Sequence, residues 1–284
     1  MQYSNLKSGM FLDDIFFAVV RIVTSDPLTG ISAVGTGFLY STWTNTEGSV
    51  ESILLISNRH VLSNGHSRIT LIFNKRSDDT TKPDLGNTVT FTDDNLKEQI
   101  IDHPDPEIDL ACLPVTGIKG SEHQVFCTVA NDALTSIPDS MIVHAGKEVF
   151  FIGYPDNRFD AVHNLPILRR GYIASLPDID FNGKPQFVID AQVFPGSSGS
   201  PVFIESSGAF RLFGVVTATM VKDEQLKPIS VNTVASSFFG VQQTIGLGLV
   251  IKVKPLTELI SFAKEKIEQE SKRLKFITRR KRQR

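Results

Sequence analysis

Short apolar runs recur along most of the chain and are separated by clusters of Gly, Pro, Asn and Asp. Such runs, rich in Val, Ile, Phe and Thr, predict strands, and the turn residues between them favour antiparallel neighbours. Helical spacing of apolar residues is nearly absent before residue 255, so we expect an all-β sandwich or barrels. The expected strands are Ile15–Val23, Val34–Tyr40, Ser52–Ser57, Arg68–Phe73, Val89–Thr92, Asp109–Pro114, Glu148–Ile152, Tyr172–Ser175, Gln186–Asp190, Pro201–Phe203, Phe210–Thr219 and Gly248–Val253.

The pattern changes at Pro255, a residue that suits the first turn of a helix. Apolar residues then recur at three- and four-residue spacing, which predicts one apolar stripe on a C-terminal helix. This stripe consists of Leu256, Leu259, Ile260, Ala263, Ile267 and Leu274. A polar segment in the middle of the chain separates two strand-rich halves. We therefore expect a first half at 1–118, a connection at 119–146, a second half at 147–254, and the helix with its tail at 255–284.

The composition is that of a soluble globular protein, with 284 residues, 41% hydrophobic and 21% charged. Its only cysteines, Cys112 and Cys127, are too few for a disulfide-stapled secreted domain, and we expect two buried thiols. No basic n-region or small-residue cleavage site marks an export signal near the N-terminus. No apolar stretch is long enough to span a membrane. A cytoplasmic protein is the expectation.

Charge is distributed unevenly, although the net charge is only −2. Residues 272–284 carry eight Lys and Arg and no acidic residue, which leaves 21 basic against 31 acidic residues in the rest of the chain. A basic tail of this kind can bind nucleic acid or an anionic surface through weak, salt-dependent contacts. A solvated helix end is the more ordinary interpretation. The oligomeric state is not indicated.

The segment Pro195-Gly196-Ser197-Ser198-Gly199-Ser200-Pro201 carries the clearest chemical signal. Two glycines allow tight turns that expose one hydroxyl and direct backbone N–H groups toward it. We expect Ser198 to be a nucleophile, with the N–H groups of Gly196 and Ser198 forming an oxyanion hole. Alone, the segment fits a flexible Ser-Gly loop equally well.

A weak serine nucleophile needs a contacting base and an acid that orients the base. His60 follows the apolar run Ile53–Ser57, and Asp109 lies between apolar neighbours, where a part-buried carboxylate needs a partner. A lone histidine is more often structural, and we assign that role to the other five. The combination in the order His60, Asp109, Ser198 predicts a serine endopeptidase.

This combination resembles the chymotrypsin-like (trypsin family) serine proteases, most closely the bacterial trypsin-like and HtrA-like protease domains without a PDZ domain. The matching segments are Gly35-Thr36-Gly37-Phe38-Leu39, Ser57-Asn58-Arg59-His60-Val61, Asp109-Leu110-Ala111, Gly196-Ser197-Ser198-Gly199-Ser200-Pro201 and Gly214-Val215-Val216-Thr217. The resemblance implies two six-stranded antiparallel barrels with the catalytic residues between them, and a C-terminal helix. It also implies an acyl-enzyme intermediate, a protein or peptide substrate, and no metal or other cofactor.

The family's primary substrate pocket has a floor at the sixth residue before the nucleophile, which is Gln192 here. By the same resemblance its walls would include Thr217, Thr219 and Gly248. Because no Asp lies at the floor, we expect a small or medium uncharged side chain in place of Lys or Arg. Ser197 stands where animal digestive members have an Asp that pairs with a freed N-terminus, so that activation is not expected.

Three alternative hypotheses concern the fold, the reaction and the regulation of the protein. A non-catalytic peptide-binding module could keep the same double-barrel shape. An α/β hydrolase also carries its Ser in a glycine turn, but its residues run Ser, Asp, His, and a helix follows the Ser, so we discard it. A third hypothesis concerns regulation: the enzyme is a latent effector of a bacterial stress or defence pathway. The long segment Tyr154–Gly171 could gate the cleft, although a solvated loop is its ordinary interpretation.

Overall fold

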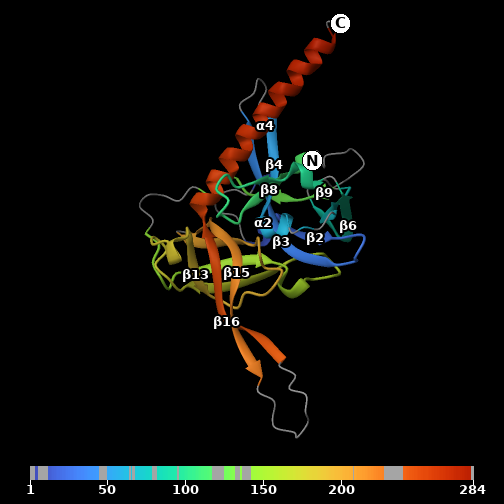
Figure 1. Ribbon diagram of the computed structural model, residues 1–284. Coiled ribbons are helices and arrows are strands. Elements are labelled where there is room, and N and C mark those ends of the chain that lie inside the picture. Colours follow the sequence, from blue (N-terminus) through green and yellow to red (C-terminus); the bar gives the residue numbers. More distant parts are fainter. Residues whose placement is uncertain are drawn as a thin grey trace.

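The computed structural model describes residues 4–5, 12–44, 50–63, 65, 68–78, 82–94, 96–116, 125–131, 135, 142–206, 208–226 and 239–282. Most of them lie in strands, and one long helix ends the described chain (Figure 1). The all-β prediction with a C-terminal helix is confirmed. Much of the predicted connection 119–146 lies outside the described residues.

The second half of the chain forms a closed six-stranded antiparallel barrel with the strand order β11-β12-β13-β16-β15-β14. Its interior is an apolar core that includes Phe151, Phe187 and Val250. β15 and β16 are long, and their outer parts extend away from the barrel as an arm (Figure 1). These strands are β11 Glu148–Gly153, β12 Ile167–Ile173, β13 Gln186–Asp190, β14 Pro201–Ser206, β15 Ala209–Leu226 and β16 Phe239–Lys252.

The first half forms an eight-stranded sheet in the order β6-β5-β2-β3-β4-β8-β7, with β9 paired to β5. In the described part of the chain this sheet does not close into a barrel. The first half therefore differs in detail from the six-stranded barrel that we expected there. The strands are β2 Val19–Ser25, β3 Ser32–Thr44, β4 Val50–Ser57, β5 Arg68–Arg76, β6 Pro83–Asp93, β7 Ile101–Asp102, β8 Ala111–Pro114 and β9 Val125–Phe126. A separate parallel pair joins β1 Ser4–Asn5 to β10 Thr128–Val129.

Strand β4 shows why the first half needs continuous apolar runs. Successive side chains of a strand point to opposite faces. Ile53 and Leu55 pack into the core of the first sheet, whereas Leu54 and Ile56 pack into a second core. This second core also holds Ile152 and Val215 from the barrel, so it joins the two halves of the molecule. Both faces of β4 are therefore buried.

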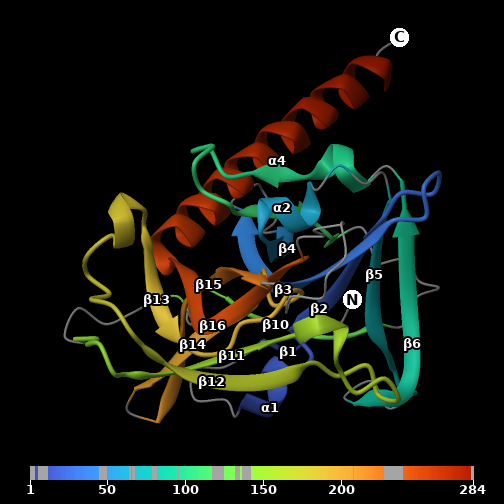
Figure 2. The same cartoon turned by 60° about the horizontal axis from the view of Figure 1, so that its bottom comes forward.

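The long helix α4 Val253–Arg282 packs its predicted apolar stripe into the core that joins the two halves. Leu256, Leu259 and Ala263 are fully buried there. The helix contacts β3 and β8 of the first half and β15 and β16 of the second, and its C-terminal part projects away from the body (Figures 1 and 2). The side chains beyond Arg273, including Leu274 and most of the basic tail, lie outside the described residues. Within the described ranges, no helix is both long enough and apolar enough to cross a membrane.

Several short helical turns were not expected from the sequence, because one turn is too short to show a helical period. Ile15 ends such a turn instead of beginning a strand, and residues 167–171 of the expected long connection belong to β12. Asp109 precedes β8 instead of lying in it. The described turns are α1 Leu12–Ile15, α2 Arg59–Leu62, η1 Leu96–Gln99, η3 Pro155–Asn157 and η4 Phe181–Gly183.

Candidate active site

His60 is presented by the single helical turn α2, which follows the buried strand β4 directly. Val61 and Leu62 are buried on one side of this turn, and the His60 side chain is 52% exposed. Gly35 on β3 permits this placement, because a Cβ at that position would collide with the Val61 side chain. Close packing of Val61 against a glycine therefore fixes the turn and directs the imidazole outward.

Asp109 is held against the same turn through its backbone and its side chain. Its carbonyl oxygen accepts a 2.8 Å hydrogen bond from Asn58 Nδ2. One carboxylate oxygen, Oδ1, accepts the His60 backbone N–H at 3.0 Å, and the other, Oδ2, lies 2.6 Å from His60 Nδ1. The neighbours Ile108 and Leu110 are buried. The two residues that the sequence paired as base and acid are thus in direct contact.

The environment of Asp109 favours its charged form. Burial raises the pKa of this carboxyl group, but hydrogen bonds from the His60 ring and backbone, the nearby imidazole and the Thr217 hydroxyl lower it. The net pKa lies below the ordinary range of an aspartate. An ionised Asp109 accepting at Oδ2 requires a proton on His60 Nδ1, which leaves Nε2 of a neutral imidazole free to accept another proton.

Ser198 lies in a loop built from two successive tight turns. The first is closed by Ser197 N–H donating to Phe194 O at 3.0 Å, and the second by Ser200 N–H donating to Ser197 O at 3.0 Å. The third position of each turn is a glycine with φ of +87°, the conformation that a type II turn needs. Both glycines, Gly196 and Gly199, also lie where a Cβ would collide with backbone carbonyls of neighbouring segments.

Thr36 on β3 ties this loop to the first half of the molecule. Its backbone N–H donates to Ser198 O at 2.9 Å, and its hydroxyl donates to Gly196 O at 2.7 Å. Both carbonyls are thereby held on the β3 side of the loop. In the part of the chain that the structure describes, the N–H groups of Gly196 and Ser198 donate no hydrogen bond. These are the two donors predicted for the oxyanion.

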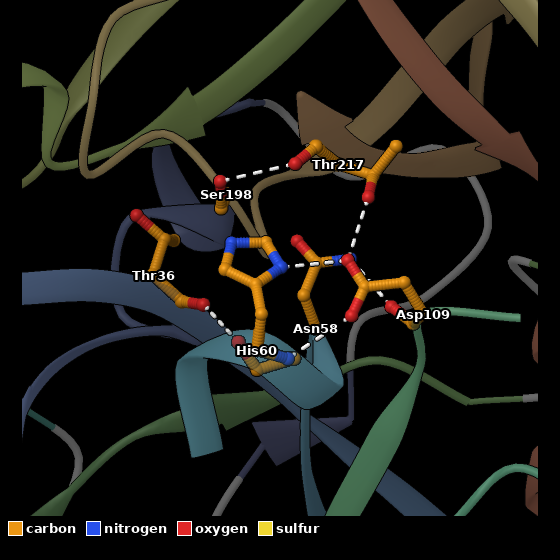
Figure 3. A network of polar contacts seen from close by, with 7 residues as sticks. Thr36, Asn58, His60, Asp109, Ser198 and Thr217 are labelled. Atoms are coloured by element: carbon orange, nitrogen blue, oxygen red, sulfur yellow. Dashed lines mark hydrogen bonds and ion pairs between the residues drawn. The ribbon is translucent and has the colours of Figure 1, made fainter. Parts of the chain in front are cut away.

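The His60 imidazole lies between the Asp109 carboxylate and the Ser198 side chain, with its second nitrogen on the Ser198 side (Figure 3). The Ser198 hydroxyl donates to Thr217 O at 3.2 Å, and among the described residues no hydrogen bond joins it to His60. His60 and Ser198 line the same cavity, whose volume is about 210 Å³. The rest of its lining is Thr24, Ala33, Val34, Gly35, Val61, Pro195 and Gly196.

The four predicted substrate-pocket residues lie outside the lining of the cavity that His60 and Ser198 share. Gln192, expected at a pocket floor, is exposed. The Thr217 hydroxyl donates to Asp109 Oδ2 at 2.9 Å, and Thr219 Oγ1 is buried without a hydrogen-bond partner in the described part of the chain. Gly248 faces the side chains of Val193 and Ile189, which leave no room for a Cβ. None of the four predicted residues lines the cavity beside His60, so the substrate pocket remains a prediction.

The sequence interpretation missed three contributions to this site: the two hydrogen bonds of Thr36, the Asn58 side chain and the Thr217 hydroxyl. All three residues lie in the segments that carried the resemblance. Their position in these segments, near the glycines and His60, was the feature of the sequence that could have indicated a role in the site. Among the described residues, no group of three His, Cys, Asp or Glu side chains is arranged to hold a metal ion.

Comparison with known proteins gives a family and distant structural likenesses. A protease from M. tuberculosis, Rv3671c in its active form, is 18% identical with a TM-score of 0.49; the match covers 91% of this chain and 88% of that one. Human heparin binding protein is 12% identical with a TM-score of 0.49, over 87% of this chain and 90% of that one. No curated protein matches the chain. The family model described as the trypsin-like peptidase domain matches residues 35–215, which is more than half of the chain and contains His60, Asp109 and Ser198, and the protein therefore belongs to this family.

Proposed function

We propose that the protein is a serine endopeptidase in which Ser198 is the nucleophile, His60 the general base and Asp109 the acid that orients His60. The observation that carries this proposal is the 2.6 Å contact between His60 Nδ1 and Asp109 Oδ2, with Ser198 on the other side of the imidazole (Figure 3). Membership of the trypsin-like peptidase domain family supports it independently.

The reaction follows from the proton positions. His60 Nε2 takes the proton of Ser198 as the hydroxyl oxygen attacks the scissile carbonyl of a peptide, and Asp109 stabilises the imidazolium that forms. The imidazolium then protonates the leaving amine, which departs and leaves an acyl-enzyme ester on Ser198. His60 next removes a proton from water, the resulting attack releases the acid product, and the proton returns to Ser198. No metal or organic cofactor enters these steps.

The developing oxyanion needs donors that are not already used. The N–H groups of Gly196 and Ser198 meet this condition, because neither donates a hydrogen bond in the described chain. Removing one oxyanion donor typically costs about 3–4 kcal/mol of transition-state stabilisation. Ser198 Oγ must rotate from Thr217 O toward His60 to react, and catalytic hydrogen bonds often tighten only when substrate binds.

Labelling with a serine-directed fluorophosphonate tests this proposal. The wild-type protein should be labelled on one serine, and Ser198→Ala should abolish the labelling while the protein remains folded. Ser197→Ala and Ser200→Ala are matched controls, because these neighbouring hydroxyls are buried and have no hydrogen-bond partner among the described residues. Undiminished labelling of Ser198→Ala would refute the assignment.

One observation favours a second candidate function, a peptide-binding module without catalysis. The Ser198 hydroxyl is bonded to Thr217 O, so the resting arrangement lacks the hydrogen bond that activates a nucleophile. Incubating the protein with a peptide library distinguishes the two functions. Cleaved products support the peptidase, whereas retention of intact peptides without labelling of Ser198 supports the module.

The biological setting belongs to the same proposal. Cys112 and Cys127 form no disulfide and both are buried, which fits a reducing cytoplasm. Uncontrolled proteolysis there is harmful, so we propose that the enzyme is a latent effector of a stress or defence pathway. Strong constitutive turnover of casein by the purified protein would argue against latency.

A role of residues 272–284 in binding nucleic acid predicts salt-dependent DNA or RNA binding that their deletion removes.

A further inference from the structure

The orientation of one peptide group determines whether Gly196 can act as an oxyanion donor. This peptide joins Pro195 to Gly196, in the middle of the turn that ends at Ser197. Because a peptide group is planar and trans, its C=O and N–H point in opposite directions. The peptide in such a turn can flip, and a flip would exchange the two groups and place a carbonyl oxygen where the donor is needed. Any contact that holds the Pro195 carbonyl therefore also directs the Gly196 N–H.

A contact that holds the Pro195 carbonyl is present, and the segment around Asp156 supplies it. The Asp156 backbone N–H donates to Pro195 O at 2.6 Å, a short hydrogen bond for an amide donor. The same segment limits the turn sterically, because a Cβ on Gly196 would collide with Tyr154 O. The segment Tyr154–Asn157 thus contacts the turn at both residues of the critical peptide.

The segment that supplies this hydrogen bond has an unfavourable backbone. Asp156 and Asn157 have φ of +49° and +54°, in the left-handed region that non-glycine residues seldom occupy. Asp and Asn tolerate this region better than other residues, but the conformation persists only where surrounding contacts support it. The turn η3 therefore needs an anchor from another part of the chain.

Arg21 on β2 of the first half is that anchor. Its Nε and Nη2 both donate to Asn157 Oδ1, at 3.0 and 2.6 Å. Its guanidinium lies over the Phe159 ring, 4.5 Å from the centroid, and Phe159 packs edge-on against Tyr154 at 5.8 Å. The Arg21 side chain thus binds Asn157, which has the positive φ, and contacts the aromatic pair that flanks η3. Arg21 belongs to the first half of the molecule, whereas η3 belongs to the second.

We propose that Arg21 and Asn157 are positioning residues that hold the Pro195–Gly196 peptide in the orientation an oxyanion hole requires. The effect passes from Arg21 to Asn157, then through the Asp156 N–H to the Pro195 carbonyl. The inference rests on the proposed peptidase function and extends it: the first half of the molecule controls the oxyanion donor of the second half. Losing this anchor would leave His60, Asp109 and Ser198 in place and would reduce the rate of acylation.

Four single variants test this inference. Arg21→Met keeps an apolar stem but removes the donors and the charge. Asn157→Gly removes the acceptor without backbone strain, because glycine adopts positive φ freely. Asn157→Asp keeps both the acceptor and the tolerance for this backbone. Arg158→Met is the matched control, because Arg158 lies in the same loop but its side chain is 77% exposed, and its guanidinium forms an ion pair with the Asp156 carboxylate at 3.5 Å.

Two measurements are made on each folded variant, with thermal unfolding as the check on folding. Hydrogen exchange of the Asp156 amide reports the bond to Pro195 and does not depend on activity. Fluorophosphonate labelling of Ser198, with kcat and KM for a peptide ester where turnover is detected, reports the oxyanion hole. We expect Arg21→Met and Asn157→Gly to expose the Asp156 amide and to lower the labelling rate and kcat about tenfold or more, with KM little changed. Asn157→Asp and Arg158→Met should match the wild type.

The outcomes separate this inference from the function on which it rests. Unchanged labelling of Arg21→Met and Asn157→Gly would overturn the positioning role, whether or not Asp156 exchange changed. Slower labelling with a fully protected Asp156 amide would also overturn it, because the effect would then bypass the proposed contact. A wild type that is not labelled at all would refute the peptidase, and Asp156 exchange would still show whether Arg21 holds the peptide.

Discussion

The Thr217 hydroxyl donates a 2.9 Å hydrogen bond to the carboxylate of Asp109, so a barrel strand of the second half fixes the acid supplied by the first. Thr217 lies in β15 and is 7% exposed, which shields this bond from water. Asp109 Oδ2 therefore accepts from two directions, His60 Nδ1 on one side and Thr217 Oγ1 on the other. The relative position of the two halves is thereby coupled to the orientation of the imidazole.

The first prediction concerns this hydroxyl. Thr217→Val keeps the branched shape and removes the donor, so the Asp109 pKa should rise and kcat should fall about fivefold, as expected for one hydrogen bond of about 1 kcal/mol. Thr219→Val is the control for stability, because Thr219 Oγ1 is buried without a partner from the described residues and its loss should be neutral or stabilising. Steady-state kinetics and urea unfolding measure both effects. An unchanged kcat in Thr217→Val would show that His60 alone orients Asp109.

The second prediction concerns acid stability. The folded pKa of Asp109 is lowered, so its contribution to the free energy of unfolding is fully present above its unfolded pKa of about 3.9 and is lost as the pH falls through the lower folded value. Asp109→Asn removes the titration. We expect the stability difference between wild type and Asp109→Asn to shrink below about pH 4 in urea unfolding measured at several pH values. The same variant should lower kcat about 10⁴-fold at neutral pH, because an amide favours the wrong tautomer of His60. A stability difference independent of pH would contradict the lowered pKa.

Local patterns in the sequence predicted those parts of the fold that depend on neighbouring residues. The apolar run Ile53–Ser57 predicted β4, and the spacing after Pro255 predicted the buried stripe of α4. The same patterns placed His60 and Asp109 at strand ends, and the structure brings them into contact. The tight turns of the Ser198 loop were also predictable, because the glycines that they need lie within the same short segment of the sequence.

Other features depend on contacts between distant segments and leave no local trace. Thr36 binds the Ser198 loop across more than 160 residues, and Arg21 reaches Asn157 across 136. A polar residue in a strand does not indicate which segment it will meet after folding. A pocket floor at Gln192 likewise depends on the resemblance alone and stays a prediction. Single turns such as α2 and η3 carry too few residues for a periodic signal.

The third prediction concerns Gly199, the glycine after the proposed nucleophile. Its φ is +87°, and a Cβ there would collide with Thr36 O and Ser57 Oγ. Gly208→Ala isolates the backbone cost, because Gly208 has φ of +76° and no described atom lies within 4 Å of a Cβ added there. We expect Gly208→Ala to cost about 1–2 kcal/mol of stability and Gly199→Ala to cost about 1–3 kcal/mol more, with loss of Ser198 labelling. Equal unfolding free energies for the two variants would show that the loop around Gly199 rearranges to accept a Cβ at no further cost in stability.

The last prediction concerns the two thiols. Cys112 and Cys127 are 0% and 1% exposed, and burial raises the pKa of each to about 12. Since the thiolate is the reactive form, neither residue should react with a thiol reagent at pH 8 in the native protein, and both should react in urea. Any modification under native conditions must wait until the core opens. Its rate should therefore stop depending on the reagent concentration once that concentration is high. Cys112 packs in the core that joins the two halves and α4, whereas Cys127 packs in the core of the first sheet. Replacing each with Ala in turn assigns the opening rates, and faster modification of Cys112 would show that the two halves separate before the first sheet unfolds.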